Sequence, residues 1–131
     1  LYSQLENTIE ITNYKLNIWN TYESFFTENY IKYKNKLNFK DITHNAHIYN
    51  INMSSSNQRD IVIRKMKSFG VSTTFHYIPL HSTDPGIKFG KSIGDMNVTN
   101  NVANTILRLP IYPNLNIDYV IDSLRKVFTT I

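Results

Sequence analysis

The chain has no cysteine among its 131 residues, and its four glycines and four prolines are few for its length. Without cysteine there is no disulfide scaffold, no thiolate zinc site and no thiol nucleophile. No apolar run approaches the roughly 20 residues of a membrane-spanning helix, and the first residues lack the basic and then apolar pattern of a secretory signal. These absences favour a globular domain with no membrane partner, which we expect in the cytoplasm.

The charge balance is modestly basic, with a formal net charge of +4. Such a balance raises nucleic-acid binding as a hypothesis. The densest basic cluster, YIKYKNK at 30–36, interleaves lysines with tyrosines, a pattern that can follow a phosphate backbone. No RNP1 or GXXG signature accompanies the cluster, so we interpret it as a solvated helix end whose lysines complement the helix dipole. We therefore expect no nucleic-acid partner.

The first third of the chain lacks glycine and proline, which predicts one long helix, or two in series, from Leu1 to about Tyr33. Apolar residues recur there at steps of three, four or seven: Leu5, Ile9, Leu16, Trp19, Phe26 and Tyr30. If continuous, the helix would measure about 45–50 Å, whereas a compact chain of this size is about 36 Å across. We expect the helix to overhang its own domain, and we expect a chain that begins with leucine to be a processed product or an excised piece.

A strand and a second helix are predicted in the middle of the chain. NAHIYNINM at 45–53 alternates apolar and polar residues like a half-buried antiparallel strand. The helix that follows should begin at a cap formed by Ser56 or Asn57 and run to Phe69. Gly70 stands where a glycine commonly closes a helix.

The second half of the chain completes the fold class. Val71 to Phe75 is β-branched and predicts a short strand, and a short helix should begin near Thr99. LRLPIYP at 107–113 predicts an edge strand, because its prolines cannot donate to a ladder. An apolar stripe over 116–128 predicts a final helix. The sequence therefore predicts an α+β fold, with a small, mostly antiparallel sheet of about three strands and helices on one face.

Residues 75–97 show no periodicity, and a loop of this length is usually functional or mobile. The loop opens with FHYIPLH at 75–81, which contains two of the four histidines. In one interpretation this is a strand end at which Phe75 and Ile78 pack inward and Pro79 stiffens the exit. In the other it is a binding site, because imidazoles and a phenol leave a strand at a long loop. The residues alone leave both interpretations open.

The histidines also raise the hypothesis of a metal site. His44, His47, His76 and His81 have the spacings H-x-x-H and H-x(4)-H, with Asp41 nearby in sequence. Neither spacing falls on a predicted helix, and a zinc site needs three or four convergent ligands held by further hydrogen bonds. We therefore expect no metal.

Three segments carry a resemblance to a known family: NAHIYNI at 45–51, GVSTTFHYIPLH at 70–81 and LRLPIYPNL at 107–115. In this order they resemble the C-terminal part of the DegT/StrS family of sugar-nucleotide aminotransferases. These are pyridoxal-phosphate enzymes of the aspartate aminotransferase fold, fold type I. The resemblance runs nearly end to end, and is strongest to the dTDP-4-amino-4,6-dideoxygalactose transaminases of surface polysaccharide and lipopolysaccharide O-antigen biosynthesis.

The resemblance implies a reaction for which this chain would supply only part of the active site. In the family a lysine of a large domain holds the cofactor, and an amino group passes from glutamate to a 4-keto-6-deoxy sugar nucleotide. The positions of that lysine and of the other cofactor-binding residues lie before Leu1. Residues 1–40 would then be a connecting helix and loop, and 41–131 the small domain of a homodimeric enzyme. We expect this chain alone to bind no pyridoxal phosphate and to be inactive.

Residue by residue, the resemblance places His76 and Tyr77 where the small domain meets the sugar nucleotide beside the cofactor. His81 matches less closely and lies nearer the loop, but it belongs to the same predicted substrate site. Two alternatives remain for the chain as a whole. One is a non-catalytic interaction module of the same fold, and the other is a small basic nucleic-acid-binding domain.

Overall fold

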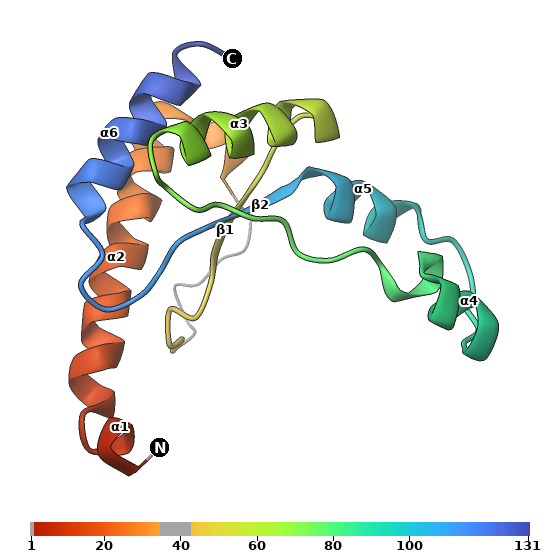
Figure 1. Cartoon of the computed structure of the whole chain (residues 1–131), viewed down its shortest axis with the longest axis horizontal. Coiled ribbons are helices and arrows are strands. Elements are labelled where there is room, and N and C mark those ends of the chain that lie inside the picture. Colours follow the sequence, from red (N-terminus) through yellow and green to blue (C-terminus); the bar gives the residue numbers. More distant parts are fainter. Residues whose placement is uncertain (1, 35–42) are drawn as a thin grey trace.

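The computed structural model describes residues 2–34 and 43–131, and it has the α+β class expected from the sequence (Figure 1). The elements follow one another as α1 (Tyr2–Glu6), α2 (Thr8–Asn29), the short 3-10 helix η1 (Ile31–Tyr33), β1 (Tyr49–Asn52), α3 (Ser56–Ser68), the 3-10 helix η2 (Leu80–Ser82), α4 (Asp84–Phe89), α5 (Asn97–Thr105), β2 (Ile106–Leu109) and α6 (Ile117–Phe128). Within the described residues, no helix is both long and apolar enough to cross a lipid bilayer.

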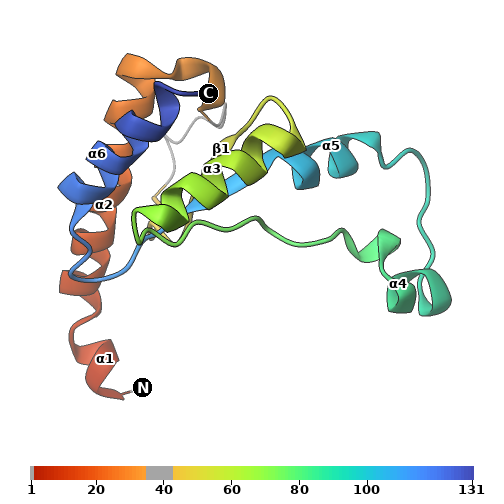
Figure 2. The same ribbon diagram turned by 45° about the horizontal axis from the view of Figure 1, so that its top comes forward.

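The N-terminal helix is two helices in series, with a break at Asn7 between α1 and α2. One face of the C-terminal half of α2 is buried: Ile18, Trp19, Tyr22, Phe25 and Phe26. The outer part is not covered, since Leu5 and Ile9 are 61% and 80% exposed. Figures 1 and 2 show α1 at the far end of α2, away from the sheet and the other helices. The expected overhang is therefore present in the structure.

The sheet consists of β1 and β2, which pair antiparallel with Tyr49 opposite Leu109 and Ile51 opposite Leu107. These four side chains share one face and are all buried, because side chains alternate between the faces of a strand. The prediction of about three strands is corrected here: in place of a strand over 71–75 the structure has a single bridge between Thr74 and Arg108. Helices on one face of the sheet are confirmed.

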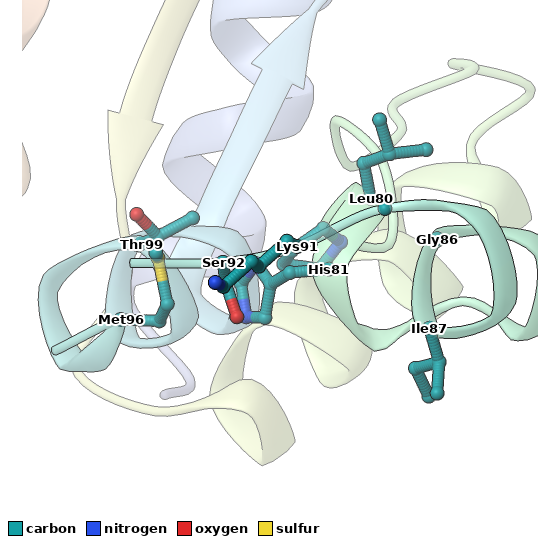
Figure 3. Close-up of a pocket in the computed structure, with 10 residues that line it drawn as sticks. Leu80, His81, Gly86, Ile87, Lys91, Ser92, Met96 and Thr99 are labelled. Atoms are coloured by element: carbon teal, nitrogen blue, oxygen red, sulfur yellow. The ribbon is translucent and has the colours of Figure 1, made fainter. Parts of the chain in front are cut away.

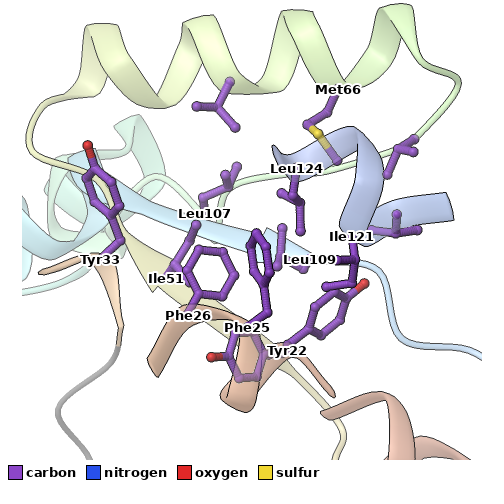
Figure 4. Close-up of a cluster of buried hydrophobic side chains, with 14 of the residues drawn as sticks. Tyr22, Phe25, Phe26, Tyr33, Ile51, Met66, Leu107, Leu109, Ile121 and Leu124 are labelled. Carbon is purple, nitrogen blue, oxygen red and sulfur yellow. The ribbon is translucent and has the colours of Figure 1, made fainter. Parts of the chain in front are cut away.

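The core lies between this face and helices α2, α3 and α6, which close over it (Figure 4). Aromatic rings from three elements meet there around Phe26, whose centroid is 5.7 Å from that of Phe128 and 6.0 Å from that of Tyr49. The Tyr22 hydroxyl is satisfied in the core, because it donates to the carbonyl oxygen of Pro110 at 2.9 Å. The core thus fixes β1, β2 and the three helices as one packed unit.

Helix α3 is capped one residue earlier than predicted. Ser55, not Ser56 or Asn57, is the N-cap, and its side chain accepts from the Gln58 amide at 3.2 Å. Gly70 follows the helix with a φ of 73°, the left-handed conformation that favours glycine, so its predicted role as a terminator is confirmed.

Residues 75–105 leave the core as a long arm that returns to the sheet at β2 (Figures 1 and 2). The irregular loop predicted over 75–97 is corrected, because η2 and α4 lie within it. Helix α5, which forms the returning half of the arm, is the short helix expected near Thr99. No residue of the arm belongs to the buried core. Many of its large apolar side chains are exposed: Phe75, Tyr77, Ile78, Leu80, Ile87, Phe89, Ile93, Val98 and Val102.

Candidate functional site

The candidate site begins where the chain leaves the sheet. The Thr74 amide donates to the Arg108 carbonyl at 3.2 Å, and the Arg108 amide donates to the Thr74 carbonyl at 2.7 Å. His76 follows two residues later, after the last backbone contact with the sheet. Its position is therefore fixed by the bridge on one side, while the segment beyond it belongs to the arm.

The His76 ring is partly buried, and its Nε2 atom is buried without a hydrogen-bond partner among the described residues. Burial lowers the pKa of His76, and the positive charges of Arg108 and His47 lower it further. The imidazole is therefore neutral at neutral pH, with one nitrogen able to donate and the other able to accept. A buried, unpaired polar atom is uncommon in proteins and calls for an explanation, such as a water or a ligand that bonds it.

Tyr77 adopts a backbone conformation that bulky residues rarely take. Its φ is 43°, in the left-handed region. Such conformations cluster at binding sites, where the surrounding structure holds them. The Tyr77 ring is 75% exposed and lies edge-on to the His76 ring, with centroids 5.0 Å apart. The turn thus presents a phenol to solvent beside a half-buried imidazole.

His76 and Tyr77 line one wall of an open hollow of about 680 Å³. The opposite wall comes from α5, through Val98, Thr99 and Val102. The lining is mainly apolar and contains no lysine and no carboxylate. A pyridoxal cofactor needs a lysine for its Schiff base and an acidic partner for its ring nitrogen, so the residues of this hollow do not fit that group.

His81 lies apart from this hollow. It lines a second one of about 560 Å³, together with Gly86, Lys91, Met96 and other residues (Figure 3). Its Nε2 atom is 3.0 Å from the Asn100 Oδ1 atom, so this ring has a partner within the arm. The structure therefore brings two of the three predicted site residues together and places the third in the adjoining hollow.

The histidines do not converge on a metal. Among the described residues, no group of three or more metal-ligating side chains comes together. His44 packs on Trp19 with centroids 4.6 Å apart, and its Nδ1 atom accepts from the Ala46 amide at 3.2 Å. Asp41 lies outside the described residues.

The basic cluster at 30–36 is partly neutralised. Lys34 forms an ion pair with Glu23 at 2.6 Å, and Lys32 lies 4.6 Å above the ring of Tyr33. The rest of the cluster, 35–36, lies outside the described residues. These contacts engage both described lysines within the chain, and the interpretation as a solvated helix end stays a prediction.

Sequence reasoning missed Arg59 and Arg108, the two arginines nearest the site. Arg108 had a detectable signal, because it is the polar residue of the alternating LRL segment and had to face away from the core. No sequence pattern indicated Arg59, since an arginine in the first turns of an amphipathic helix is ordinarily solvated.

Comparison with known proteins decides the family. The model of the DegT/DnrJ/EryC1/StrS aminotransferase family matches residues 1–127. The chain belongs to this family. The predicted resemblance is thereby confirmed, and it covers almost the whole length.

A curated family relative is the dTDP-3-amino-3,4,6-trideoxy-alpha-D-glucose transaminase of Micromonospora megalomicea subsp. nigra. It is 29% identical over 90 residues, which cover 65% of this chain and 24% of the relative. This chain thus spans about a quarter of the length of that aminotransferase.

Solved structures of aminotransferases share the fold at low identity. TlmJ of Streptoalloteichus hindustanus matches with a TM-score of 0.82 and 21% identity, covering 98% of this chain and 34% of that one. PseC of Helicobacter pylori, an aminotransferase of pseudoaminic acid biosynthesis, matches with 0.80 and 17%, covering 99% and 36%. The pyridoxal-phosphate form of the sugar aminotransferase Spr1654 of Streptococcus pneumoniae matches with 0.79 and 21%, covering 96% and 33%. The fold is therefore that of about one third of such an enzyme.

Proposed function

We propose that this chain is the C-terminal small domain of a cytoplasmic, pyridoxal-phosphate-dependent sugar aminotransferase, and that its arm forms one wall of the sugar-nucleotide site. The observation that carries the proposal is the buried, unpaired Nε2 atom of His76 beside the exposed Tyr77 ring at an open hollow. In this reading residues 1–40 are the connecting helix and loop, and 41–131 are the small domain.

The chemistry of these two side chains suits a sugar. The neutral His76 ring would donate a hydrogen bond to a sugar hydroxyl or phosphate oxygen, which would satisfy its unpaired nitrogen. The Tyr77 ring would pack against the apolar face of a pyranose, and its hydroxyl would stay in contact with water. Arg108, beside His76, adds positive charge on the side where an anionic nucleotide would approach.

The cofactor would be held by a large domain outside this chain. The site hollow offers neither the lysine nor the carboxylate that the cofactor requires. When bound there, pyridoxal phosphate would supply the transfer of an amino group from glutamate to a 4-keto-6-deoxy sugar nucleotide, of the dTDP-4-amino-4,6-dideoxygalactose type, for lipopolysaccharide or other surface polysaccharide synthesis. The residues of this chain would bind and orient the sugar.

Two exposed apolar surfaces support the proposal that a large domain and a second subunit pack against this chain. Ile87, Phe89 and Ile93 of the arm are 67%, 80% and 84% exposed, and such a patch on a soluble protein commonly marks an interface. The outer face of α1 and α2, with Leu5 and Ile9, is a second uncovered apolar surface. We infer that the large domain and a second subunit of a homodimer cover them.

The test uses the full-length enzyme with glutamate and dTDP-4-keto-6-deoxy sugars. His76→Ala should raise KM for the sugar nucleotide or lower kcat, whereas Lys88→Ala, near the outer end of the arm, should change neither. Unchanged kinetics in His76→Ala would leave the histidine with a structural role only, in the segment after the Thr74 bridge. Wild-type enzyme that aminates no sugar nucleotide would refute the proposed function itself.

A second test uses the 131-residue chain. It should bind no pyridoxal phosphate and show no transaminase activity, because the groups that hold the cofactor would lie elsewhere. A new visible absorbance band after addition of the cofactor, resistant to gel filtration, would contradict this.

A further inference from the structure

Arg59 of α3 contacts both halves of the arm close to the points where they leave the domain. Its Nη1 atom donates to the Ala103 carbonyl oxygen at 3.1 Å, on the returning half in α5. The guanidinium carbon lies 4.7 Å from the centroid of the Phe75 ring, on the outgoing half. One side chain, anchored in a core-packed helix, therefore touches both halves where they meet the domain.

The contacts use one face of the guanidinium and all three of its nitrogens. Its Nε and Nη2 atoms reach the Asp60 carboxylate at 2.9 and 2.8 Å, which fixes the plane of the group. The Ala103 carbonyl is in the last turn of α5, where carbonyls lack partners within the helix and a cation is favoured by the dipole. The Arg59 side chain is only 11% exposed, so water competes weakly for these contacts.

The two residues that Arg59 contacts line or adjoin the site. Phe75 directly precedes His76, and Ala103 lines the same hollow as His76 and Tyr77. Because Phe75 is joined to His76 through the backbone, a change in the separation of Phe75 and Ala103 would move the His76–Tyr77 wall relative to Ala103. We propose that Arg59 is a positioning residue of the sugar-nucleotide site, which sets the distance between the His76–Tyr77 wall and the α5 wall. This inference rests on the proposed function of that site.

Lysine cannot replace arginine in this role. An ammonium group is a point charge that can bond Ala103, but it has no plane with which to cover Phe75 while also meeting the Asp60 carboxylate on two nitrogens. We therefore expect kcat/KM for the sugar nucleotide to be highest in wild type, lower in Arg59→Lys and lowest in Arg59→Met.

The kinetic test is made on the full-length enzyme, with sugar nucleotide and glutamate varied separately. Arg59→Met should lower kcat/KM for the sugar nucleotide about 10- to 100-fold, the range expected for displacement of a binding wall. KM for the sugar nucleotide should rise while KM for glutamate stays the same. A merely structural role would lower the active fraction, and with it kcat, and leave both KM values unchanged. Arg64→Met, at an exposed arginine five residues further along α3, is the matched control.

Two further variants keep the test decisive if Arg59→Met does not fold. Asp60→Asn leaves the arginine in place but weakens the contact that orients it, and Asp60 is 47% exposed, so the fold should tolerate the change. Asp60→Asn and Arg59→Lys should both raise KM for the sugar nucleotide by a few-fold. If both folded variants keep the wild-type KM, Arg59 is not a positioning residue, even where wild-type activity upholds the proposed function.

Amide hydrogen exchange on the 131-residue chain gives a readout that is independent of activity. In Arg59→Lys, exchange should accelerate in 75–82 and 97–105 together, while β1 and α6 keep their protection. Acceleration spread evenly over the chain, or none in these two segments, would overturn the inference.

Discussion

The His81 Nε2 atom and the Asn100 Oδ1 atom lie 3.0 Å apart and tie η2 to α5 across the arm. The amide oxygen only accepts, so the ring nitrogen donates. Arg59 of α3 links the same two halves indirectly, because it bonds Ala103 of the returning half and lies over the Phe75 ring of the outgoing half. The arm therefore has internal structure although none of its side chains enters the core.

Removing the outer cross-link should loosen the arm without unfolding the domain. His81→Ala loses one partly buried hydrogen bond, worth about 1 kcal/mol, which corresponds to roughly fivefold faster local opening. Amide exchange of residues 80–100 should accelerate by that order, and the thermal midpoint should stay within about 1 °C because the core is untouched. Asn101→Ala, with an exposed side chain on the same helix, is the control. Equal exchange in His81→Ala and wild type would show that the cross-link does not hold the arm.

Gly86 is required by close packing rather than by its backbone angle. A Cβ atom on it would overlap the carbonyl oxygen of Leu80, because η2 folds back onto the first turn of α4. Thr83 fixes this arrangement: its hydroxyl donates to the Leu80 carbonyl at 2.8 Å and accepts from the Gly86 amide at 3.2 Å. Alanine at position 86 must push η2 and α4 apart.

Gly86→Ala should therefore destabilise the outer arm by about 1–3 kcal/mol, the usual cost of overpacking. Limited proteolysis within 80–92 should become faster than in wild type. Ile87→Ala, at the next position of α4 and 67% exposed in the wild type, should leave the cleavage rate unchanged. Equal cleavage of Gly86→Ala and Ile87→Ala would show that the close contact relaxes at no cost.

The elements with a buried stripe could be predicted from the sequence, because burial imposes a period that the residues record. The α6 stripe of Val120, Ile121, Leu124 and Phe128 is an example, and so is the alternation that buries Tyr49. The strand expected at 71–75 was wrong because its β-branched residues satisfy the same pattern with one bridge only. Propensity indicates that a segment suits a sheet, but it does not say whether a partner strand is available.

The arm could be predicted only in part, for a physical reason. Its apolar residues do not pack against this chain, so they record no period that local reasoning can detect. The α4 helix escaped notice because its six residues, DPGIKF, contain both proline and glycine. The site residues His76 and Tyr77 were indicated by their residue types at a strand exit, but the unpaired nitrogen and the left-handed turn needed the structure.

The pKa of His76 should rise when its cationic neighbour is removed. Burial and the positive charges of Arg108 and His47 hold this pKa below the ordinary value of 6.5. Arg108→Gln keeps the backbone pairing of β2 and removes the neighbouring charge that has the larger effect on the pKa of His76. The NMR titration midpoint of the His76 ring should therefore move upward. Arg64→Gln, whose charge is not among the causes of the shift, should leave it in place. No upward movement in Arg108→Gln would leave burial and His47 as the causes of the lowered pKa.

The same shift fixes the sign of a pH effect on stability. A histidine whose folded-state pKa is lowered binds protons more readily when the chain is unfolded, so its neutral form stabilises the fold above the unfolded value of about 6.5. That contribution should be lost as the pH falls through the lower folded-state pKa. Urea midpoints between pH 7 and pH 5 should fall less in His76→Gln than in wild type. A steeper fall in His76→Gln would contradict the direction of the shift.

Phe26 should be among the most costly residues to truncate. Its ring is fully buried and contacts Phe25 at 5.1 Å between centroids, as well as rings from β1 and α6. Phe26→Ala should lower the free energy of unfolding by about 3–5 kcal/mol, because it removes buried apolar area and leaves a cavity where three elements meet. Ile9→Ala removes an apolar side chain from the same helix at an 80% exposed position and should change stability by less than about 0.5 kcal/mol in the isolated chain. In the full-length enzyme the Ile9→Ala cost should grow, because the proposed large domain or second subunit would bury that position. Equal Ile9→Ala costs in the isolated chain and in the full-length enzyme would show that the outer face of α2 stays uncovered there.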